Sequence, residues 1–153
     1  MSTGFPAGCG RVARFPVRMT TMVKIAVVDD DPSIVDVYSS MLSFFGYEPV
    51  AYIDPSAALE RMPAEEPLPA LILLDLMMTP ITGLQFLEQR RTIERLKNIP
   101  VIIVSAWDVP PEDRVRYAGD FSEIIRKPVF PHELAEKIER RIRQESTPSG
   151  KAS

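Results

Sequence analysis

Five short segments rich in apolar residues recur along the chain, and a stretch with amphipathic helical spacing follows each of them. The expected strands are residues 24–28, 48–52, 70–74, 101–104 and 123–126, and the expected helices are 32–45, 55–62, 84–96, 111–117 and 131–144. Strands joined through helices pair in parallel, with right-handed crossovers, and near-continuous apolar strands need cover on both faces. The pattern predicts one α/β domain with a doubly wound, five-stranded parallel sheet and helices on both faces.

The two ends of the chain lack this pattern. Residues 1–21 mix Gly, Pro, Arg, Thr and Ser without periodicity, and we expect a disordered N-terminal extension there. Residues 22–145 form the expected domain, and residues 146–153 read as a polar C-terminal tail. A chain of 153 residues has room for one ordinary domain with a core. With so few residues after the last expected strand, we expect no attached output domain.

Charge and composition exclude several classes of protein. The net charge is −3, and the residues after the first 21 carry −6, because the first 21 hold three arginines and no acid. Such an acidic body argues against direct nucleic-acid binding. The single cysteine, Cys9, allows no intrachain disulfide, and no apolar stretch is long enough to span a membrane or form a signal peptide. We therefore expect a cytoplasmic protein without membrane contact.

Polar residues that can bind metal and phosphate follow four of the expected strands. Asp29 and Asp30 follow the first strand, Asp75 the third, Ser105 the fourth and Lys127 the fifth. The carboxyl ends of parallel strands share one edge of the sheet, where such folds bind their ligands. These side chains are therefore expected to meet in one site.

The residue types in this set suit phosphoryl transfer. Mg2+ prefers carboxylate oxygens, water and phosphate oxygens, so Asp29 and Asp30 are expected to bind the metal. Asp75, at a strand end between leucines, is placed to act as a nucleophile that forms an acyl phosphate. Lys127 and Ser105 can stabilise the charge that develops during transfer. A third acid, Asp31, precedes Pro32 and is explained by helix capping.

Taken together with their spacing, these motifs make residues 22–145 resemble the receiver domain of two-component response regulators. The matching pieces are Val27-Val28-Asp29-Asp30-Asp31-Pro32, Leu73-Leu74-Asp75-Leu76-Met77-Met78 with Gly83 eight residues after Asp75, Val104-Ser105-Ala106, and Arg126-Lys127-Pro128. The intervals of 30 residues from Asp75 to Ser105 and 22 from Ser105 to Lys127 also match. The resemblance implies a flavodoxin-like sheet with strand order 2-1-3-4-5 and a cis bond before Pro128.

The resemblance also implies a role for each site residue. Asp29, Asp30, Asp75 and the backbone carbonyl of Met77 would bind Mg2+. Asp75 would be the phosphoacceptor, supplied by the phosphohistidine of a histidine kinase or a histidine phosphotransfer protein. Ser105 would sense the phosphate and Lys127 would pair with it. The chain would then catalyse only its own phosphorylation and slow autodephosphorylation, and would not be an enzyme in any further sense.

Two functions remain open for such a domain. In the first, a phosphorylation switch acts on an unknown downstream protein through residues 111–117, 123–126 and 131–144. In the second, the domain is a phosphorelay shuttle or phosphate sink without conformational output. Ile124 gives the second some weight, because receiver domains usually carry an aromatic switch residue at that position. Met77 and Trp107 flank the expected phosphate and can hinder water, which suggests a slowly decaying phosphoform.

Two enzyme or cofactor alternatives fit the motifs poorly. An aspartyl-phosphate phosphatase of the haloacid dehalogenase type needs a second acid two residues after its nucleophile, where this chain has Met77. A flavin-binding domain of similar architecture needs a phosphate loop rich in Ser, Thr and Gly after the first strand. The three aspartates at residues 29–31 would repel a phosphate there.

Overall fold

Five parallel strands form a single sheet in the order β2-β1-β3-β4-β5. In the computed structural model, which describes residues 22–146, the strands are β1 (Lys24–Val28), β2 (Glu48–Tyr52), β3 (Leu71–Leu74), β4 (Val101–Ser105) and β5 (Glu123–Arg126). The helices are α2 (Pro32–Phe44), α3 (Pro55–Arg61), α4 (Gly83–Arg90), α5 (Pro111–Arg116) and α6 (Pro131–Ser146), with a 3-10 turn η1 at Met62–Ala64. This architecture confirms the predicted fold class and strand order. The expectations for residues 1–21 and 147–153 lie outside the described residues.

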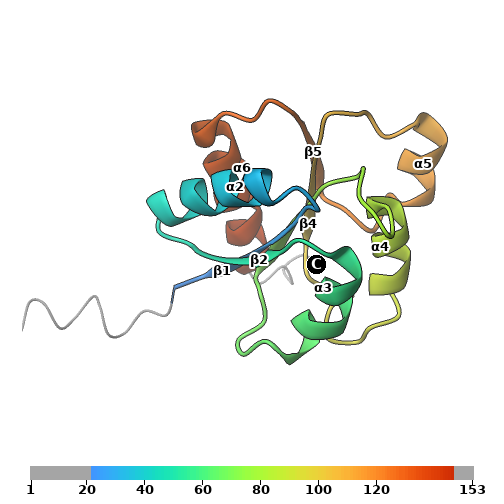
Figure 1. The fold of residues 1–153 in the computed structure, drawn as a ribbon, viewed down its shortest axis with the longest axis horizontal. Coiled ribbons are helices and arrows are strands. Elements are labelled where there is room, and N and C mark those ends of the chain that lie inside the picture. Colours follow the sequence, from blue (N-terminus) through green and yellow to red (C-terminus); the bar gives the residue numbers. More distant parts are fainter. Residues whose placement is uncertain (1–21, 147–153) are drawn as a thin grey trace, which may run out of the picture.

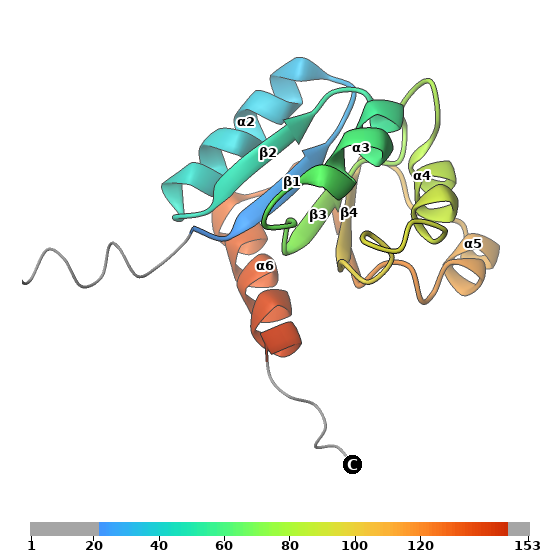
Figure 2. The ribbon, with the colours of Figure 1, turned by 90° about the horizontal axis from the view of Figure 1, so that it is seen from below.

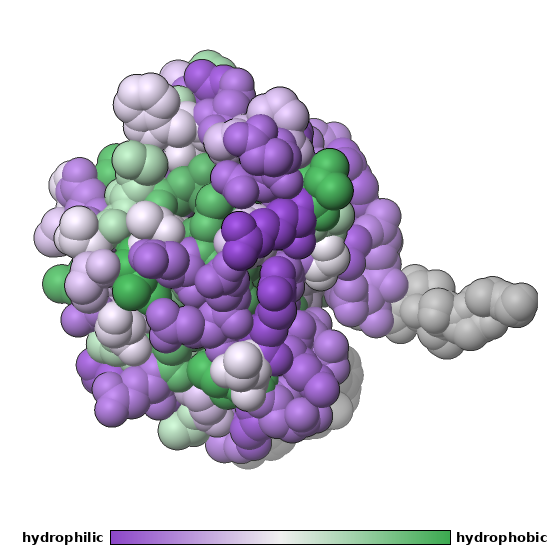
Figure 3. Space-filling model, turned by 90° about the vertical axis from the view of Figure 1, so that its right-hand side faces the viewer, coloured by the Kyte–Doolittle hydropathy of each residue, from purple (hydrophilic) through white to green (hydrophobic). Residues whose placement is uncertain are grey.

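The helices cover both faces of the sheet, as Figures 1 and 2 show. Alternate residues of each strand point to opposite faces, which divides the core into two apolar clusters. On one face, Val28, Leu74 and Ile103 pack against α3 and α4, together with Val109 and Tyr117, which flank α5. On the other face, Val27 and Leu73 and their neighbours pack against α2 and α6. Figure 3 faces the side formed by α4 and α5, where hydrophobic and hydrophilic residues alternate on the surface.

Both ends of α2 follow from local sequence. Asp31 caps the helix, because its carboxylate accepts a hydrogen bond from the Ser33 backbone N–H at 2.9 Å, and Pro32 occupies the first helical position. Gly46 follows the last turn with a φ of 90°, a conformation that side chains other than glycine rarely adopt. Both features confirm the expected helix boundaries.

Helix α4 differs most from its prediction, whereas the ends of the other helices lie within two residues of theirs. The periodicity predicted residues 84–96, yet α4 ends at Arg90 and turns follow, although Leu96 is fully buried. The Thr92 hydroxyl donates to the Gln89 carbonyl, and the backbone there changes to shorter i to i+3 hydrogen bonds. The buried Arg90 side chain donates to the Ile99 carbonyl, which draws the connection to β4 back under the helix end.

None of the helices within residues 22–146 is long and apolar enough to cross a membrane.

Candidate functional site

The carboxyl ends of β1, β3, β4 and β5 bring the polar strand-end residues together, as predicted. In the sheet register Val28 lies beside Leu74, so Asp29 and Asp75, the next residues along, leave neighbouring strands side by side. One carboxylate oxygen from each of Asp29, Asp30 and Asp75 lies within 4.8 Å of the others. Asp29 and Asp75 are buried, whereas Asp30 is partly exposed. These three acids form the aspartate cluster.

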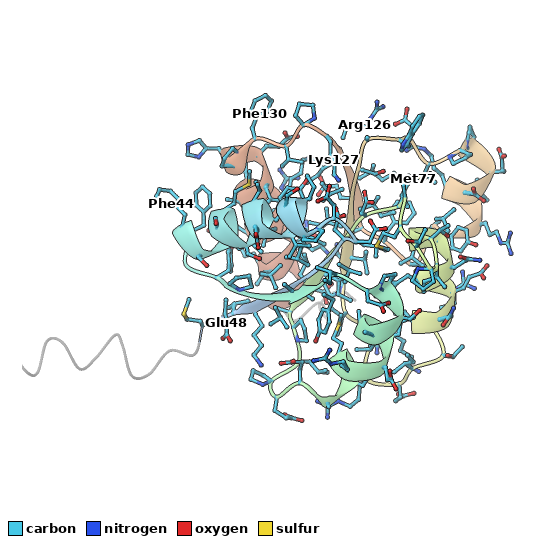
Figure 4. All side chains as sticks on the ribbon, in the orientation of Figure 1. Phe44, Glu48, Met77, Arg126, Lys127 and Phe130 are labelled. Atoms are coloured by element: carbon cyan, nitrogen blue, oxygen red, sulfur yellow. The ribbon has the colours of Figure 1, made fainter. Side chains whose placement is uncertain are left out.

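Lys127, which is labelled in Figure 4, places its ammonium group against this cluster. Its Nζ atom lies 3.3 Å from Asp29 Oδ2 and 3.4 Å from Asp75 Oδ1. The Lys127 backbone N–H donates to the Ser105 carbonyl at 3.0 Å, which holds the segment after β5 beside β4. The bond between Lys127 and Pro128 is cis, as the resemblance implied. One cation therefore bridges the two buried carboxylates.

Burial and like charge make ionisation of the cluster costly. The pKa of Asp75 lies above its ordinary value, chiefly because burial disfavours the carboxylate and secondly because Asp29 is close. Lys127 opposes both effects. The pKa of the buried Tyr38 hydroxyl is also raised, by burial first and then by the charges of Asp29 and Asp75. The site therefore favours any added positive charge.

Asp29 is oriented by the start of α2. Its Oδ1 atom accepts a hydrogen bond from the backbone N–H of Asp31 at 3.0 Å, while Oδ2 faces Lys127. The Asp31 carboxylate is turned to Ser33, whose hydroxyl and N–H lower the pKa of Asp31. Asp31 is accordingly absent from the aspartate cluster, in agreement with its expected role as a helix cap.

Asp30 has a partner that the sequence analysis missed. Its Oδ2 atom accepts hydrogen bonds from the Thr79 backbone N–H at 3.1 Å and from the Thr79 hydroxyl at 3.3 Å. Thr79 lies in the loop between β3 and α4, and a cis bond joins it to Pro80. A short polar residue four positions after Asp75 was the only sequence signal. This contact ties the β3–α4 loop to the acid that follows β1.

Ser105 is fully buried at the end of β4. Its hydroxyl oxygen accepts a hydrogen bond from the Trp107 backbone N–H at 3.2 Å. The Trp107 and Met77 side chains are 62% and 59% exposed, so neither contributes to the core. Ile124 is partly buried and packs against the core cluster on the α3 and α4 side of the sheet. This position of β5 therefore carries an aliphatic side chain and not an aromatic ring.

The donor set fits a divalent cation. Three carboxylates and one ammonium leave the site with two excess negative charges, and every offered donor of the cluster is a hard oxygen. Asp29 is already oriented by the Asp31 N–H and Asp30 by Thr79. Carboxylate oxygens that are held in place by such hydrogen bonds suit a small divalent cation.

Residues 25–139 match the family model of the response regulator receiver domain. The chain belongs to this family. The receiver domain identified by its motifs is therefore confirmed, and it comprises most of the described residues.

Relatives and solved structures agree with this assignment. The phosphate regulon transcriptional regulatory protein PhoB of Escherichia coli is 33% identical over 122 residues, covering 79% of this chain and 52% of PhoB. The chain thus spans about half the length of this curated relative. The N-terminal domain of a response regulator receiver protein from Methanoculleus marisnigri is 38% identical, with a TM-score of 0.65, over 78% of this chain and 96% of that one. A CheY-like receiver domain protein from Methanospirillum hungatei is 26% identical, with a TM-score of 0.73, over 82% of this chain and 98% of that one.

Proposed function

We propose that this receiver domain is a phosphoacceptor switch. Asp75 would take a phosphoryl group from the phosphohistidine of a histidine kinase or a histidine phosphotransfer protein, and the phosphoform would signal by contact with another protein. The observation that carries this proposal is the Lys127 ammonium, which lies 3.3 Å from Asp29 and 3.4 Å from Asp75. A cation bridging two buried carboxylates beside a third acid suits a site that must accept further negative charge.

The proposed transfer is a substitution at phosphorus. An oxygen of the Asp75 carboxylate attacks phosphorus, and the bond between phosphorus and the imidazole nitrogen breaks. The nitrogen keeps the electron pair and takes up a proton, which leaves a neutral histidine and an aspartyl phosphate. Mg2+ held by Asp29, Asp30, Asp75 and the Met77 carbonyl would neutralise charge on the phosphoryl oxygens.

Lys127 and Ser105 have separate tasks in this step. Lys127 would move its contact from the Asp75 carboxylate to a phosphoryl oxygen, since its Nζ atom already lies 3.4 Å from Asp75 and its side chain is flexible. The Ser105 hydroxyl would donate to a second phosphoryl oxygen. Beyond this self-phosphorylation and its slow reversal by water, we expect no turnover of another substrate.

Phosphate uptake tests the assignment directly. The full chain incubated with Mg2+ and acetyl phosphate should gain one phosphate by intact mass, and the Trp107 fluorescence should change because Trp107 contacts Ser105. Asp75→Asn should abolish the uptake. Asp54→Asn is a matched control, because Asp54 is an exposed cap of α3 outside the site and asparagine also caps helices. Uptake by Asp75→Asn at the wild-type level would refute the site.

A second function, a phosphorelay shuttle or phosphate sink, is favoured by Ile124. Without an aromatic ring at this position, rotation of a ring cannot report the state of Ser105 to the face formed by α5, β5 and α6. Adding beryllofluoride, which mimics the acyl phosphate, separates the two functions. In NMR spectra, a switch should show changes in backbone amide chemical shifts that extend beyond the strand ends. A phosphate sink should show such changes only at the aspartate cluster.

The lifetime of the phosphoform is a related question. Met77 and Trp107 lie on the loops that flank Asp75, and their bulky apolar side chains can obstruct the attacking water. We therefore infer a slow hydrolysis, which Met77→Ala and Trp107→Ala should each accelerate. A wild-type half-life of a few seconds would contradict this inference.

A further inference from the structure

We propose that the cavity between the β3–α4 loop, α4 and the β4–α5 loop binds a partner segment in which an apolar side chain stands beside a lysine or arginine. We further infer that phosphorylation of Asp75 is reported to this cavity through Ser105 and Trp107, an inference that rests on the proposed function. This surface includes the first turn of α5, through Asp113, but otherwise differs from the α5, β5 and α6 face expected from the sequence.

The cavity offers apolar walls next to the aspartate cluster. Its volume is about 360 Å3, large enough for an aromatic or long aliphatic side chain. It is lined by Leu76, Met77, Thr82, Leu84, Trp107, Asp108, Pro110 and Asp113. Met77 and Trp107 are mostly exposed, although both are large and apolar. Figure 3 shows that hydrophobic residues are exposed among hydrophilic ones on the side of the molecule formed by α4 and α5.

The charge around the cavity selects the partner. The ionisable groups that line it are the acids Asp108 and Asp113, and no basic side chain lines it. Asp108 pairs with Arg126 at 2.9 Å, but both are more than half exposed, so a competing cation can replace this pair at small cost. Glu112 adds a further acid in the first turn of α5. A segment with a basic residue beside its apolar anchor therefore complements this site.

A hydrogen bond connects the cavity to the phosphorylation chemistry. The Trp107 N–H donates to the Ser105 hydroxyl oxygen at 3.2 Å, and Ser105 is fully buried next to the aspartate cluster. To donate to a phosphoryl oxygen on Asp75, the Ser105 side chain would rotate about its Cα–Cβ bond, and this rotation would carry the hydroxyl oxygen away from the Trp107 N–H. Trp107 would then lose the hydrogen bond that holds its backbone. Its indole ring, which lines the cavity, would change position. This path needs no aromatic residue at Ile124.

Selection of short peptides tests the cavity. A displayed peptide library is selected on the full chain loaded with Mg2+ and beryllofluoride, with the Leu84→Glu chain as the target for counter-selection. Leu84 lines the cavity and is only partly buried. The selected peptides should combine an aromatic or long aliphatic residue with lysine or arginine. Synthetic copies should bind Leu84→Glu about tenfold or more weakly by calorimetry.

Two further variants keep the test independent of folding. Trp107→Ala removes an exposed wall of the cavity without opening the core, and should also weaken binding. Phe44→Ser is the matched control, because Phe44 is 82% exposed on α2 and lies far from Met77 in Figure 4. Peptides that bind the wild type, Leu84→Glu and Trp107→Ala equally would overturn the proposal. Dependence on Phe44, a preference for acidic peptides, or no selection above background would do the same.

Phosphorylation coupling is measured with the same peptides. Their affinity should differ by about fivefold or more between the Mg2+ form and the beryllofluoride form, and equal affinities would overturn the reporting path. The measurements distinguish a failure of the binding proposal for the cavity from a failure of the proposed phosphoacceptor function. If Leu84→Glu takes up phosphate from acetyl phosphate normally while no chain binds peptide, only the cavity is refuted. If the wild type takes up no phosphate, the proposed function fails, and peptide binding to the Mg2+ form still tests the cavity.

Discussion

Gly83 gives the most direct test of how tightly the site is packed. It is the first residue of α4, and its N–H donates to the Leu76 carbonyl at 2.8 Å. A Cβ atom added at this position would overlap the Asp75 carbonyl oxygen and lie 2.8 Å from the Cα of Leu76. Both are backbone atoms, which cannot move aside by rotation of a side chain. The Gly83→Ala change therefore requires the chain just after β3 to shift.

The sign of the change in unfolding free energy shows whether packing or helix propensity dominates at Gly83. Alanine in a helix is favoured over glycine by about 0.5–1 kcal/mol, so propensity predicts a more stable protein. Overpacking against fixed atoms costs about 1–3 kcal/mol, and the backbone contacts place this site in the upper part of that range. We expect a net loss of about 1–2 kcal/mol. The urea midpoint should then fall by about 0.5–1 M.

The control is Gly119→Ala. Gly119 is exposed in the turn after α5, and an added Cβ there meets nothing within 4 Å. This change should leave stability unaltered or raise it by up to about 1 kcal/mol. Calorimetric titration should also show weaker Mg2+ binding to Gly83→Ala, because Asp75 is displaced. If Gly83→Ala is as stable as the wild type while Gly119→Ala behaves as expected, the packing argument is refuted.

Three further predictions concern the aspartate cluster without metal. Asp75→Asn should raise the free energy of unfolding near neutral pH, because burial and Asp29 raise the pKa of Asp75 and make its ionised form costly. In thermal melts this gain in stability should disappear towards about pH 4, where the wild-type carboxyl is protonated in the native state. A gain in stability that does not depend on pH would contradict the assignment. Asp30→Ala should weaken Mg2+ binding in calorimetric titration yet leave the metal-free protein as stable as the wild type or more so; a clear loss of stability would count against carboxylate crowding. Thr79→Val should reduce Mg2+ affinity by about tenfold, since the hydroxyl that orients Asp30 is removed; unchanged affinity would show that the backbone N–H alone holds Asp30.

The architecture and the gathering of the site residues were predictable from local sequence. The alternation of apolar segments and amphipathic stretches fixes a parallel sheet, and residues that end parallel strands must share one edge. Asp29, Asp75 and Lys127 therefore come together although almost 100 residues separate the first from the last. The helix cap at Asp31 and the glycine after α2 were also readable, because both depend on neighbouring residues only.

The periodicity misled where a long-range contact decided the outcome. Ile93 and Leu96 continue the helical spacing of α4, so the sequence indicated a helix through residue 96. Leu96 is buried as expected, but from a turn. The Arg90 side chain binds the Ile99 carbonyl beyond the helix end, and no local pattern encodes that contact.

The sequence by itself determined the fold class, the edge of the sheet where chemistry is placed, and the residue types that meet there. Tertiary structure decided how those residues are held: Thr79 on Asp30 across 49 positions of sequence, Lys127 between two carboxylates, and Trp107 on Ser105. It also decided that two loops and the first turns of α4 and α5 line an open, largely apolar cavity beside the site. The physical reason is the distance along the sequence over which each interaction acts. Periodicity and capping act over a few residues, whereas the path of a loop depends on which distant side chains can satisfy its polar groups.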